Sequence, residues 1–150
     1  TPKMIEDSIK PFTDKNINVT NLMSKIKSKD EFSDPNEVKV VCDKNNFALY
    51  FSREPIPSFE KHGDHDIMMK QVCIIPFRRD FLIAFNKMQE TPLEIIESID
   101  MLRVLENGMQ VKMVETNEET YSVDTQEDLS KVELKMMKDD LVKEYSQYAL

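Results

Sequence analysis

Short runs of hydrophobic residues in the first half of the chain are typical of β-strands. We predict four strands there, over residues 18–26, 38–42, 47–51 and 70–77. The segment 43–46 (Asp-Lys-Asn-Asn) predicts the turn of a hairpin between two of them, because Asn tolerates a positive φ. Polar residues 29–36 predict a loop, and residues 53–69, with Pro55 and Pro57, predict an irregular segment.

Helical spacing of apolar residues predicts four helices, at residues 2–10, 78–88, 92–107 and 126–136. A fifth strand is expected at residues 109–115. In the third helix, Thr91 and Glu94 predict a capping box, and Gly108 predicts a left-handed end. Its expected buried stripe consists of Ile95, Ile96, Ile99, Leu102 and Leu105.

The last helix is expected to begin at a Thr125 cap, with Asp128 at its third position. Its expected buried stripe is Leu129, Val132 and Met136, and residues 137–150 are expected to fray. Strands and helices alternate in the second half of the chain, which favours a layered α/β sheet over a helix bundle or a β-sandwich.

Composition narrows the functions that this fold could carry. The chain has 150 residues, 40% hydrophobic and 32% charged, which fits one globular domain. A formal net charge of -8 argues against a nucleic-acid partner, because phosphate binding needs concentrated Lys and Arg. The longest apolar run, Val72–Phe77, is far shorter than the roughly 20 residues of a membrane span, so no membrane association is expected.

The cysteines and glycines indicate the cellular compartment and exclude one kind of phosphate-binding site. Cys42 and Cys73 lie in strand-like runs without ligand-type spacing, so we expect reduced thiols and a cytoplasmic protein. No export signal is visible at the beginning of the sequence. The chain contains only two glycines, which excludes a Gly-rich phosphate loop from these residues.

Three segments, in this order, carry a resemblance to a known family. They are residues 51–57 (FSREPIP), 92–103 (PLEIIESIDMLR) and 123–129 (VDTQEDL). They resemble the CMP-Kdo synthetases, cytidylyltransferases that activate 3-deoxy-manno-octulosonate (Kdo) for lipopolysaccharide. The resemblance extends over roughly residues 2–135, because the order and spacing of the three segments are similar to those of the family.

The resemblance implies part of a three-layer α/β/α nucleotide-diphospho-sugar transferase-like fold with a mixed sheet. It also implies that residues 1–150 are the C-terminal sugar-binding and dimerisation portion of a homodimeric enzyme. The N-terminal portion, with the triphosphate loop, the cytosine pocket and the first metal-binding aspartate, would precede them. We therefore expect that this chain alone releases no pyrophosphate from CTP.

The resemblance assigns roles to individual residues. Asp124 would be a catalytic carboxylate that binds Mg²⁺, although an Asp next to a helix cap is also commonplace without a metal. Arg53 would bind the carboxylate of the sugar acid, and its alternative is a surface ion pair. Glu94 and Glu97 share one helical face, and either could hold sugar hydroxyls; we favour Glu97 for the sugar and Glu94 for the cap.

The chain departs from the family pattern in the fourth strand. The Kdo enzymes show a His-x-Gly-x-Tyr pattern whose His and Tyr belong to the sugar pocket, and here Gln71 and Ile75 occupy those places. Gln71 can donate and accept hydrogen bonds, whereas Ile75 can do neither. We therefore include Gln71 among the substrate-binding residues, and the sugar could be Kdo, a modified octulosonate or another 2-keto-3-deoxy acid.

A polar cluster remains that the family does not explain: His62, Asp64, His65 and Asp66. These side chains are possible ligands for a divalent metal, but they lie in a loop without helical spacing, so we favour a solvated loop.

The leading interpretation is a cytidylyltransferase that condenses CTP with Kdo or a related 3-deoxy-2-ulosonic acid, with Mg²⁺. One alternative is a non-catalytic module for sugar-acid binding or dimerisation. Another is a cytidylyltransferase for a nonulosonate sugar.

Overall fold

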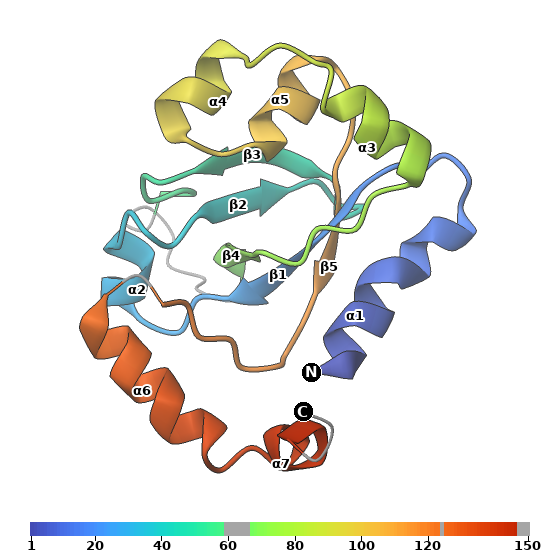
Figure 1. Ribbon diagram of the computed structural model, residues 1–150. Helices are drawn as coiled ribbons and strands as arrows, with labels where there is room; N and C mark the ends of the chain where they lie inside the picture. Colours follow the sequence, from blue (N-terminus) through green and yellow to red (C-terminus); the bar gives the residue numbers. More distant parts are fainter. Residues whose placement is uncertain (59–66, 124, 147–150) are drawn as a thin grey trace. The chain divides into compact units, whose positions relative to one another are not determined.

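Five strands pair into a mixed sheet in the order β3-β2-β4-β1-β5 (Figure 1). The strands are β1 (Thr20–Lys25), β2 (Lys39–Cys42), β3 (Ala48–Ser52), β4 (Met69–Val72) and β5 (Lys112–Glu115). β1 pairs antiparallel with β4 and parallel with β5, and β2 joins β3 and β4, both antiparallel. The predicted α/β class and the mixed sheet are therefore confirmed.

The computed structural model describes residues 1–58, 67–123 and 125–146. Within them the chain divides into two units, Thr1–Glu118 and Glu119–Leu150. The first unit contains the sheet together with α1 (Pro2–Ile9), η1 (Lys10–Thr13), α2 (Lys29–Ser33), α3 (Arg79–Phe85), α4 (Pro92–Glu97) and α5 (Met101–Glu106). The second unit contains α6 (Gln126–Met136) and α7 (Asp140–Ser146).

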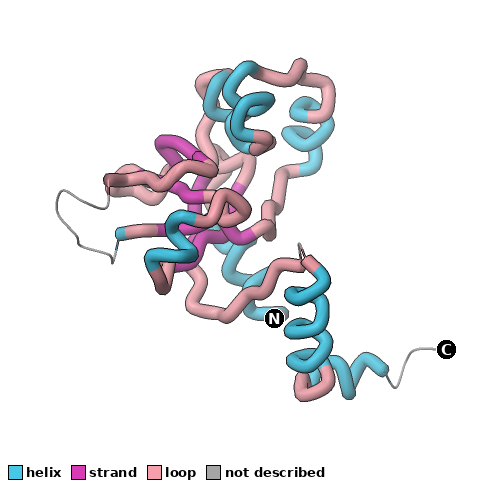
Figure 2. Tube along the Cα trace, turned by 90° about the vertical axis from the view of Figure 1, so that its left-hand side faces the viewer, coloured by secondary structure: helices cyan, strands magenta, loops and turns pink. Residues whose placement is uncertain are grey.

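Helices cover both sides of the sheet in the first unit. Figures 1 and 2 show α3, α4 and α5 on one side of the strands. The largest core cluster lies there, where Met101, Leu102 and Val104 of α5 pack with Val40 and Phe51. On α1, Met4 packs against Leu22 and Val72, and the Thr20 hydroxyl donates to the Ser8 carbonyl at 2.6 Å.

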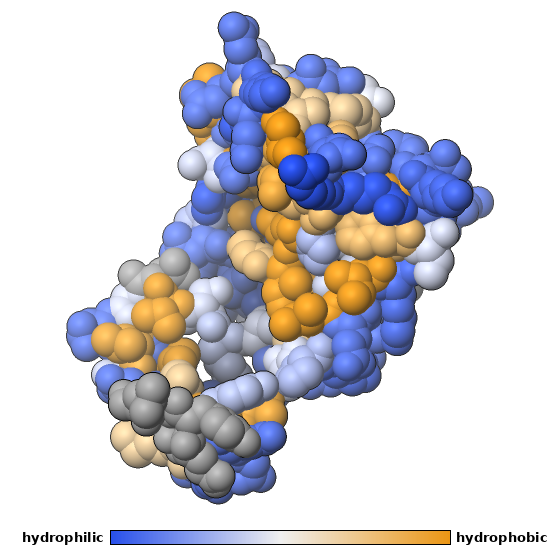
Figure 3. Space-filling model, turned by 45° about the vertical axis from the view of Figure 1, so that its right-hand side comes forward, coloured by the Kyte–Doolittle hydropathy of each residue, from blue (hydrophilic) through white to orange (hydrophobic). Residues whose placement is uncertain are grey.

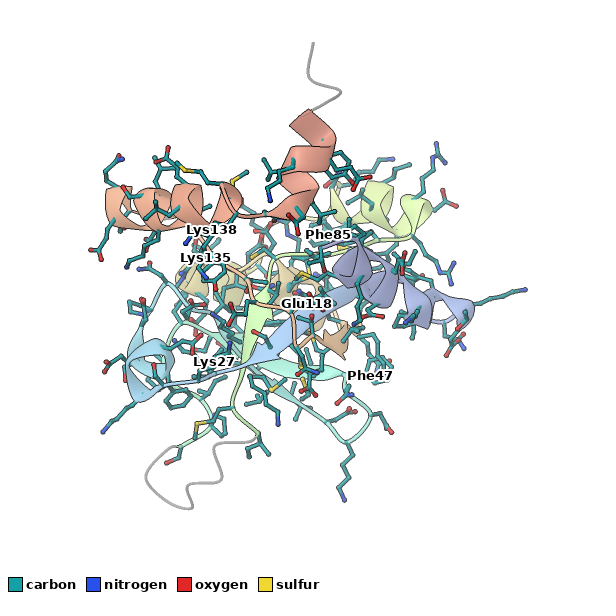
Figure 4. The ribbon with its side chains drawn as sticks, turned by 90° about the horizontal axis from the view of Figure 1, so that it is seen from below. Lys27, Phe47, Phe85, Glu118, Lys135 and Lys138 are labelled. Atoms are coloured by element: carbon teal, nitrogen blue, oxygen red, sulfur yellow. The ribbon has the colours of Figure 1, made fainter. Side chains whose placement is uncertain are left out.

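The hairpin β2–β3 forms as its sequence predicts. Val40 pairs with Phe51, and Asn46 adopts a left-handed conformation with a φ of 57°. The carboxylate of Asp43 accepts the backbone N–H groups of Asn45 and Phe47, both at 2.8 Å, which fixes the turn. Phe47, labelled in Figure 4, lies at the tip of the hairpin, where the Lys112 ammonium is 4.9 Å from its ring centroid.

Residues 29–36 are only partly a loop, which corrects the prediction. The short helix α2 occupies Lys29–Ser33, because Ser28 caps it by accepting the Glu31 N–H at 3.1 Å. Glu31 in turn accepts the N–H of Lys27 at 2.6 Å, and Phe32 is buried. This spacing of a cap Ser and a Glu three residues later is a helix-start signal that the polar composition concealed.

The predicted helix over residues 92–107 is wrong in its continuity. Ser98 adopts a left-handed conformation with a φ of 56° and separates α4 from α5. Ile99 and Leu102 are buried as expected, whereas Ile95 and Ile96 are 63% and 77% exposed. The break turns the stripe, so that only its second half faces the core.

The other boundaries differ in smaller ways. β4 ends at Val72 rather than at residue 77, although the Pro76 carbonyl still accepts the Thr20 N–H at 3.0 Å. Cys42 packs at the main core, as expected of a small hydrophobe, and burial raises the pKa of its thiol to about 11. Cys73 is exposed, so the expected packing is wrong for that thiol.

In the second unit, the Thr125–Asp128 capping box of α6 is confirmed. The expected buried stripe is not: no described residue of α6 is buried, and Leu129 and Met136 are 37% and 50% exposed. Within the segment that we expected to fray, α7 forms a helix. Figure 4 labels Lys135 of α6, whose ammonium lies 3.9 Å from the centroid of the Tyr121 ring. None of the helices in the described part of the chain combines the length and the apolar composition of a transmembrane segment.

Gly108 provides a test of the helix end after α5. Its φ is +72°, and a Cβ there would meet no atom within 4 Å. Gly108→Ala should therefore lower the free energy of unfolding by about 1 kcal/mol through backbone strain alone, measured by urea denaturation. Gly108→Asn is the matched control and should lose less, because Asn adopts this conformation more readily; equal stability of all three proteins would contradict the assignment.

Candidate functional site

The end of β3 meets the end of α4 through the side chain of Glu97. Its Oε1 accepts hydrogen bonds from the hydroxyls of Ser52 (2.8 Å) and Tyr50 (3.3 Å), and its Oε2 accepts the backbone N–H of Arg53 (2.8 Å). Tyr50 and Ser52 alternate along β3 and therefore present their hydroxyls on one face. Burial, together with the nearby Glu97 charge, raises the pKa of Tyr50.

Arg53 uses its guanidinium to hold three backbone carbonyls. Nε donates to the Glu97 carbonyl at 2.6 Å, Nη2 to the Ser98 carbonyl at 3.2 Å, and Nη1 to the Pro35 carbonyl at 2.9 Å. The last carbonyls of a helix lack intrahelical partners, and Arg53 supplies them for α4. These contacts account for the break at Ser98: the left-handed residue directs two carbonyls towards one side chain.

Glu94 lies one turn before Glu97 on α4, but its carboxylate serves another network. It is 6% exposed, accepts Arg103 Nε at 2.7 Å and also pairs with Arg103 Nη2. Its Oε2 accepts the Thr91 N–H at 3.2 Å, which confirms its part of the capping box. The guanidinium of Arg103 stacks over the ring of Phe85, labelled in Figure 4, at 4.6 Å from its centroid.

Gln71 is half-buried on the central strand β4, in register with Met23 of β1. Its side chain donates from Nε2 to Oδ1 of Asn21 at 2.6 Å. Asn21 is fully buried and donates to the Val72 carbonyl at 2.7 Å. Ile75 is partly buried and packs against the main core.

Lys39 is a charged residue whose burial in the structure is the opposite of what its neighbours in the sequence suggest. A lysine between valines in a strand suggests a solvent-facing position, yet Lys39 is 0% exposed. Its ammonium donates to the Asp34 carbonyl at 2.8 Å, and burial lowers its pKa. Lys39 and Arg53 thus hold the adjacent carbonyls of Asp34 and Pro35, which ties the loop after α2 to the site.

The structure brings together two of the predicted site residues, Arg53 and Glu97, and holds Glu94 and Gln71 in separate hydrogen-bond networks within the described chain. Four further residues of these networks were not predicted from the sequence: Tyr50, Ser52, Asn21 and Lys39. The alternation of Tyr50 and Ser52 before Arg53 was a usable signal, whereas nothing in the sequence indicated burial of Lys39 or the partner of Gln71.

Asp124 and the cluster of His62, Asp64, His65 and Asp66 lie outside the described residues. Within residues 1–58, 67–123 and 125–146, no group of three or more His, Cys, Asp or Glu side chains is arranged to hold a metal ion. The metal role of Asp124 therefore stays a prediction from the sequence.

The Glu94–Arg103 pair predicts a pH dependence of stability. The Arg103 hydrogen bonds hold the pKa of Glu94 below its ordinary value of 4.5. Because the pKa is lower in the folded state, the stabilisation is fully present above pH 4.5 and is lost as the pH falls through the folded pKa. Glu94→Gln should lower the free energy of unfolding by about 3 kcal/mol at pH 7 and reduce its fall in acid.

Thermal and urea unfolding between pH 7 and pH 3 measure both effects. Asp80→Asn is the control, because Asp80 pairs with Arg79 at the surface, with side-chain exposures of 94% and 85%. The free energy of unfolding of this control variant should lie within about 0.5 kcal/mol of that of the unaltered chain. The interpretation fails if Glu94→Gln retains the acid dependence of the unaltered chain.

The three carbonyl contacts of Arg53 predict that a lysine cannot replace it. Arg53→Lys should lower the free energy of unfolding by about 2 kcal/mol, because an ammonium cannot match the planar fork of a guanidinium. Arg79→Lys, at an exposed position, is the matched control and should be nearly neutral. Equal unfolding midpoints in urea for both variants would refute the structural role of Arg53.

Comparisons with known proteins identify the family. The Cytidylyltransferase family matches residues 1–133. The 3-deoxy-manno-octulosonate cytidylyltransferase of Fusobacterium nucleatum is 46% identical over 131 residues, covering 87% of this chain and 53% of the relative. The enzyme of the same name from Geobacter metallireducens is 45% identical over 142 residues, covering 87% of this chain and 56% of the relative.

A solved structure agrees with these relatives. The structure of CMP:2-keto-3-deoxy-manno-octonic acid synthetase complexed with CTP is 32% identical, with a TM-score of 0.83. The match covers 91% of this chain and 56% of that one. The chain spans about half the length of the relatives that it matches. On this sequence and structural evidence, the chain belongs to the cytidylyltransferase family.

Proposed function

We propose that the intact protein condenses CTP with Kdo to give CMP-Kdo and pyrophosphate. The observation that carries this proposal is the similarity of the chain to enzymes of that name at 46% and 45% identity, together with a CTP-complexed structural neighbour. The anomeric hydroxyl of the sugar would attack the α-phosphorus, forming an O–P bond while the bond to the leaving pyrophosphate breaks.

Arg53 and Glu97 are the residues that we propose for sugar binding. Arg has five N–H groups, and three donate to carbonyls, so that two remain for the carboxylate of the sugar acid, counting the described residues. Oε2 of Glu97 accepts one hydrogen bond from the described chain and keeps a lone pair for a sugar hydroxyl. Both oxygens of Glu94 are engaged by Arg103, which favours Glu97 over Glu94 for this role.

Mg²⁺ and its ligand Asp124 are part of the proposal, and the resemblance in residues 123–129 supports them. A bound Mg²⁺ would neutralise phosphate charge during the transfer. The proposed sugar is Kdo because the relatives are named for that substrate. Gln71 and Ile75 stand where the family pattern has His and Tyr, so other 3-deoxy-2-ulosonic acids, nonulosonates included, remain outcomes of the test.

A homodimer is also proposed, from the resemblance. Figure 3, turned towards the side that carries α1 and α3, shows hydrophobic side chains gathered on this face. Large apolar residues of these two helices are exposed: Ile5, Ile9, Leu82 and Ile83. Such a surface favours association, and the proposed occupant is a second copy of the chain. The cytoplasmic location expected from the sequence stays a prediction.

Pyrophosphate release by the protein from its full reading frame, with CTP, Mg²⁺ and Kdo, tests the function. Asp124→Asn should lower kcat by at least about 100-fold, because the amide cannot replace a metal-binding carboxylate. The control is Asp139→Asn, which changes another acidic residue of the second unit and should retain activity. Absence of turnover with Kdo, but turnover with another sugar acid, would retain the cytidylyltransferase and reject Kdo; no turnover with any sugar acid would favour a non-catalytic module.

A further inference from the structure

The turn between α2 and β2 has local hydrogen bonds of its own. The Asp34 carbonyl accepts the backbone N–H of Glu37 at 3.1 Å, and the Asp34 carboxylate accepts that of Asn36 at 2.9 Å. Pro35 stands at the second position of the turn, which its fixed φ favours. The Lys39 ammonium donates a further hydrogen bond to the Asp34 carbonyl, at 2.8 Å. Lys39 is therefore an addition to a turn that local contacts already define.

Burial of Lys39 costs the fold more than one hydrogen bond returns. The side chain is 0% exposed, and one of its three ammonium N–H groups has an acceptor within the described chain. The carboxylates of Asp34, Glu37 and Glu54 favour its charge, but no ion pair joins any of them to the ammonium. An apolar side chain of similar volume is often neutral or stabilising at such a position. Folding alone therefore does not explain why a lysine stands here.

Lys70 offers a comparison within the same sheet. It lies directly opposite Lys39 on β4, and its ammonium pairs with Glu31 at 2.7 Å and with Glu37 at 2.9 Å. These ion pairs tie α2 and the turn that follows it to the sheet. The charge of Lys70 is thus compensated by two carboxylates, whereas Lys39 gives its hydrogen bond to a backbone carbonyl.

The contact of Lys39 restricts the carbonyl that follows in the chain. The Asp34 carbonyl belongs to the planar peptide that joins it to the Pro35 nitrogen, and the proline ring fixes the next φ. One soft dihedral, the ψ of Pro35, therefore separates the two carbonyls. The Pro35 carbonyl is the group that accepts Arg53 Nη1 at 2.9 Å. Lys39 thus acts on the guanidinium of Arg53 through a single stiff residue.

We propose that Lys39 is a positioning residue, which acts through the Asp34–Pro35 peptide to hold Arg53 in the orientation that binds the carboxylate of the sugar acid. The inference rests on the proposed function, in which two N–H groups of Arg53 remain for that carboxylate. Loss of Lys39 releases the Pro35 carbonyl, and the guanidinium then keeps two of its three carbonyl contacts. The effect falls on sugar binding, and neither folding nor the transfer step depends on Lys39.

The first experiment separates this role from a structural one. Lys39→Met removes the ammonium and keeps a side chain of similar length, while the Asp34 carbonyl retains the Glu37 N–H. The urea midpoint of the intact protein should therefore stay unchanged or rise. Lys70→Met should lower that midpoint, because it leaves two carboxylates without their cation. An equal fall in both variants would overturn the inference.

Steady-state kinetics of the intact protein with CTP, Mg²⁺ and Kdo measure the role itself. Lys39→Met should raise the KM for Kdo about five-fold, the loss expected for one hydrogen bond, while kcat and the KM for CTP stay unchanged. The matched control is Lys112→Met, because Lys112 also donates to a backbone carbonyl, that of Asn45 at the hairpin turn. It should leave all three constants unchanged. An unchanged KM for Kdo in Lys39→Met would overturn the inference.

A double variant tests whether Lys39 acts through Arg53. In the Arg53→Lys background, Lys39→Met should raise the KM for Kdo by less than about two-fold, because the guanidinium that it positions is already absent. If the full five-fold rise persists in that background, Lys39 acts by another route and the inference is wrong.

A ¹⁵N spectrum of the intact protein tests the positioning without turnover. The Arg53 Nε–H signal, assigned by its absence from Arg53→Lys, should shift or broaden in Lys39→Met but not in Lys112→Met. The same signal in Lys39→Met as in the unaltered protein would refute the effect of Lys39 on Arg53. Absence of turnover in the unaltered protein would overturn the proposed function, and the spectrum would then still decide whether Lys39 positions Arg53.

Discussion

The arrangement of the site depends on one constraint: the last backbone carbonyls of α4 have no partner within the helix and must be paired elsewhere. A helix must satisfy its last carbonyls, and α4 ends after six residues, in the middle of an apolar stripe that favours continuation. Arg53 offers a planar set of donors to these carbonyls, and the backbone N–H of the same residue binds the Glu97 carboxylate. The edge strand β3 is thereby joined to the helical layer that covers it.

The charged side chains of Arg53 and Lys39 are accommodated in the same region by backbone carbonyls. Arg53 and Lys39 reach the neighbouring carbonyls of Pro35 and Asp34, so the loop after α2 is tied to β2 and β3. Charged groups are costly to bury without partners, and carbonyl oxygens are partners that add no opposite charge. Similarity to CTP-using relatives gives the region its proposed chemistry, while these contacts explain why it is ordered.

The sequence predicted the elements better than their connections. The strands around residues 20–25, 39–42 and 48–52 were found from apolar runs, and the turn at Asn46 from its chemistry, because these depend on neighbouring residues. The break at Ser98 could not be found, since it depends on Arg53, which lies 45 positions away. The same limit applies to the pairing of Gln71 with Asn21, 50 positions apart, and to the burial of Lys39.

The three carbonyl contacts of Arg53 have a consequence for conformational entropy. Immobilising an arginine side chain costs about 2 kcal/mol, and this cost arises once, however many bonds the guanidinium makes. The first contact therefore carries most of the ordering cost, and the contacts that follow form at little further loss of freedom. The free energies of the three contacts are consequently not additive, and removing any one of them leaves a side chain that the other two still hold.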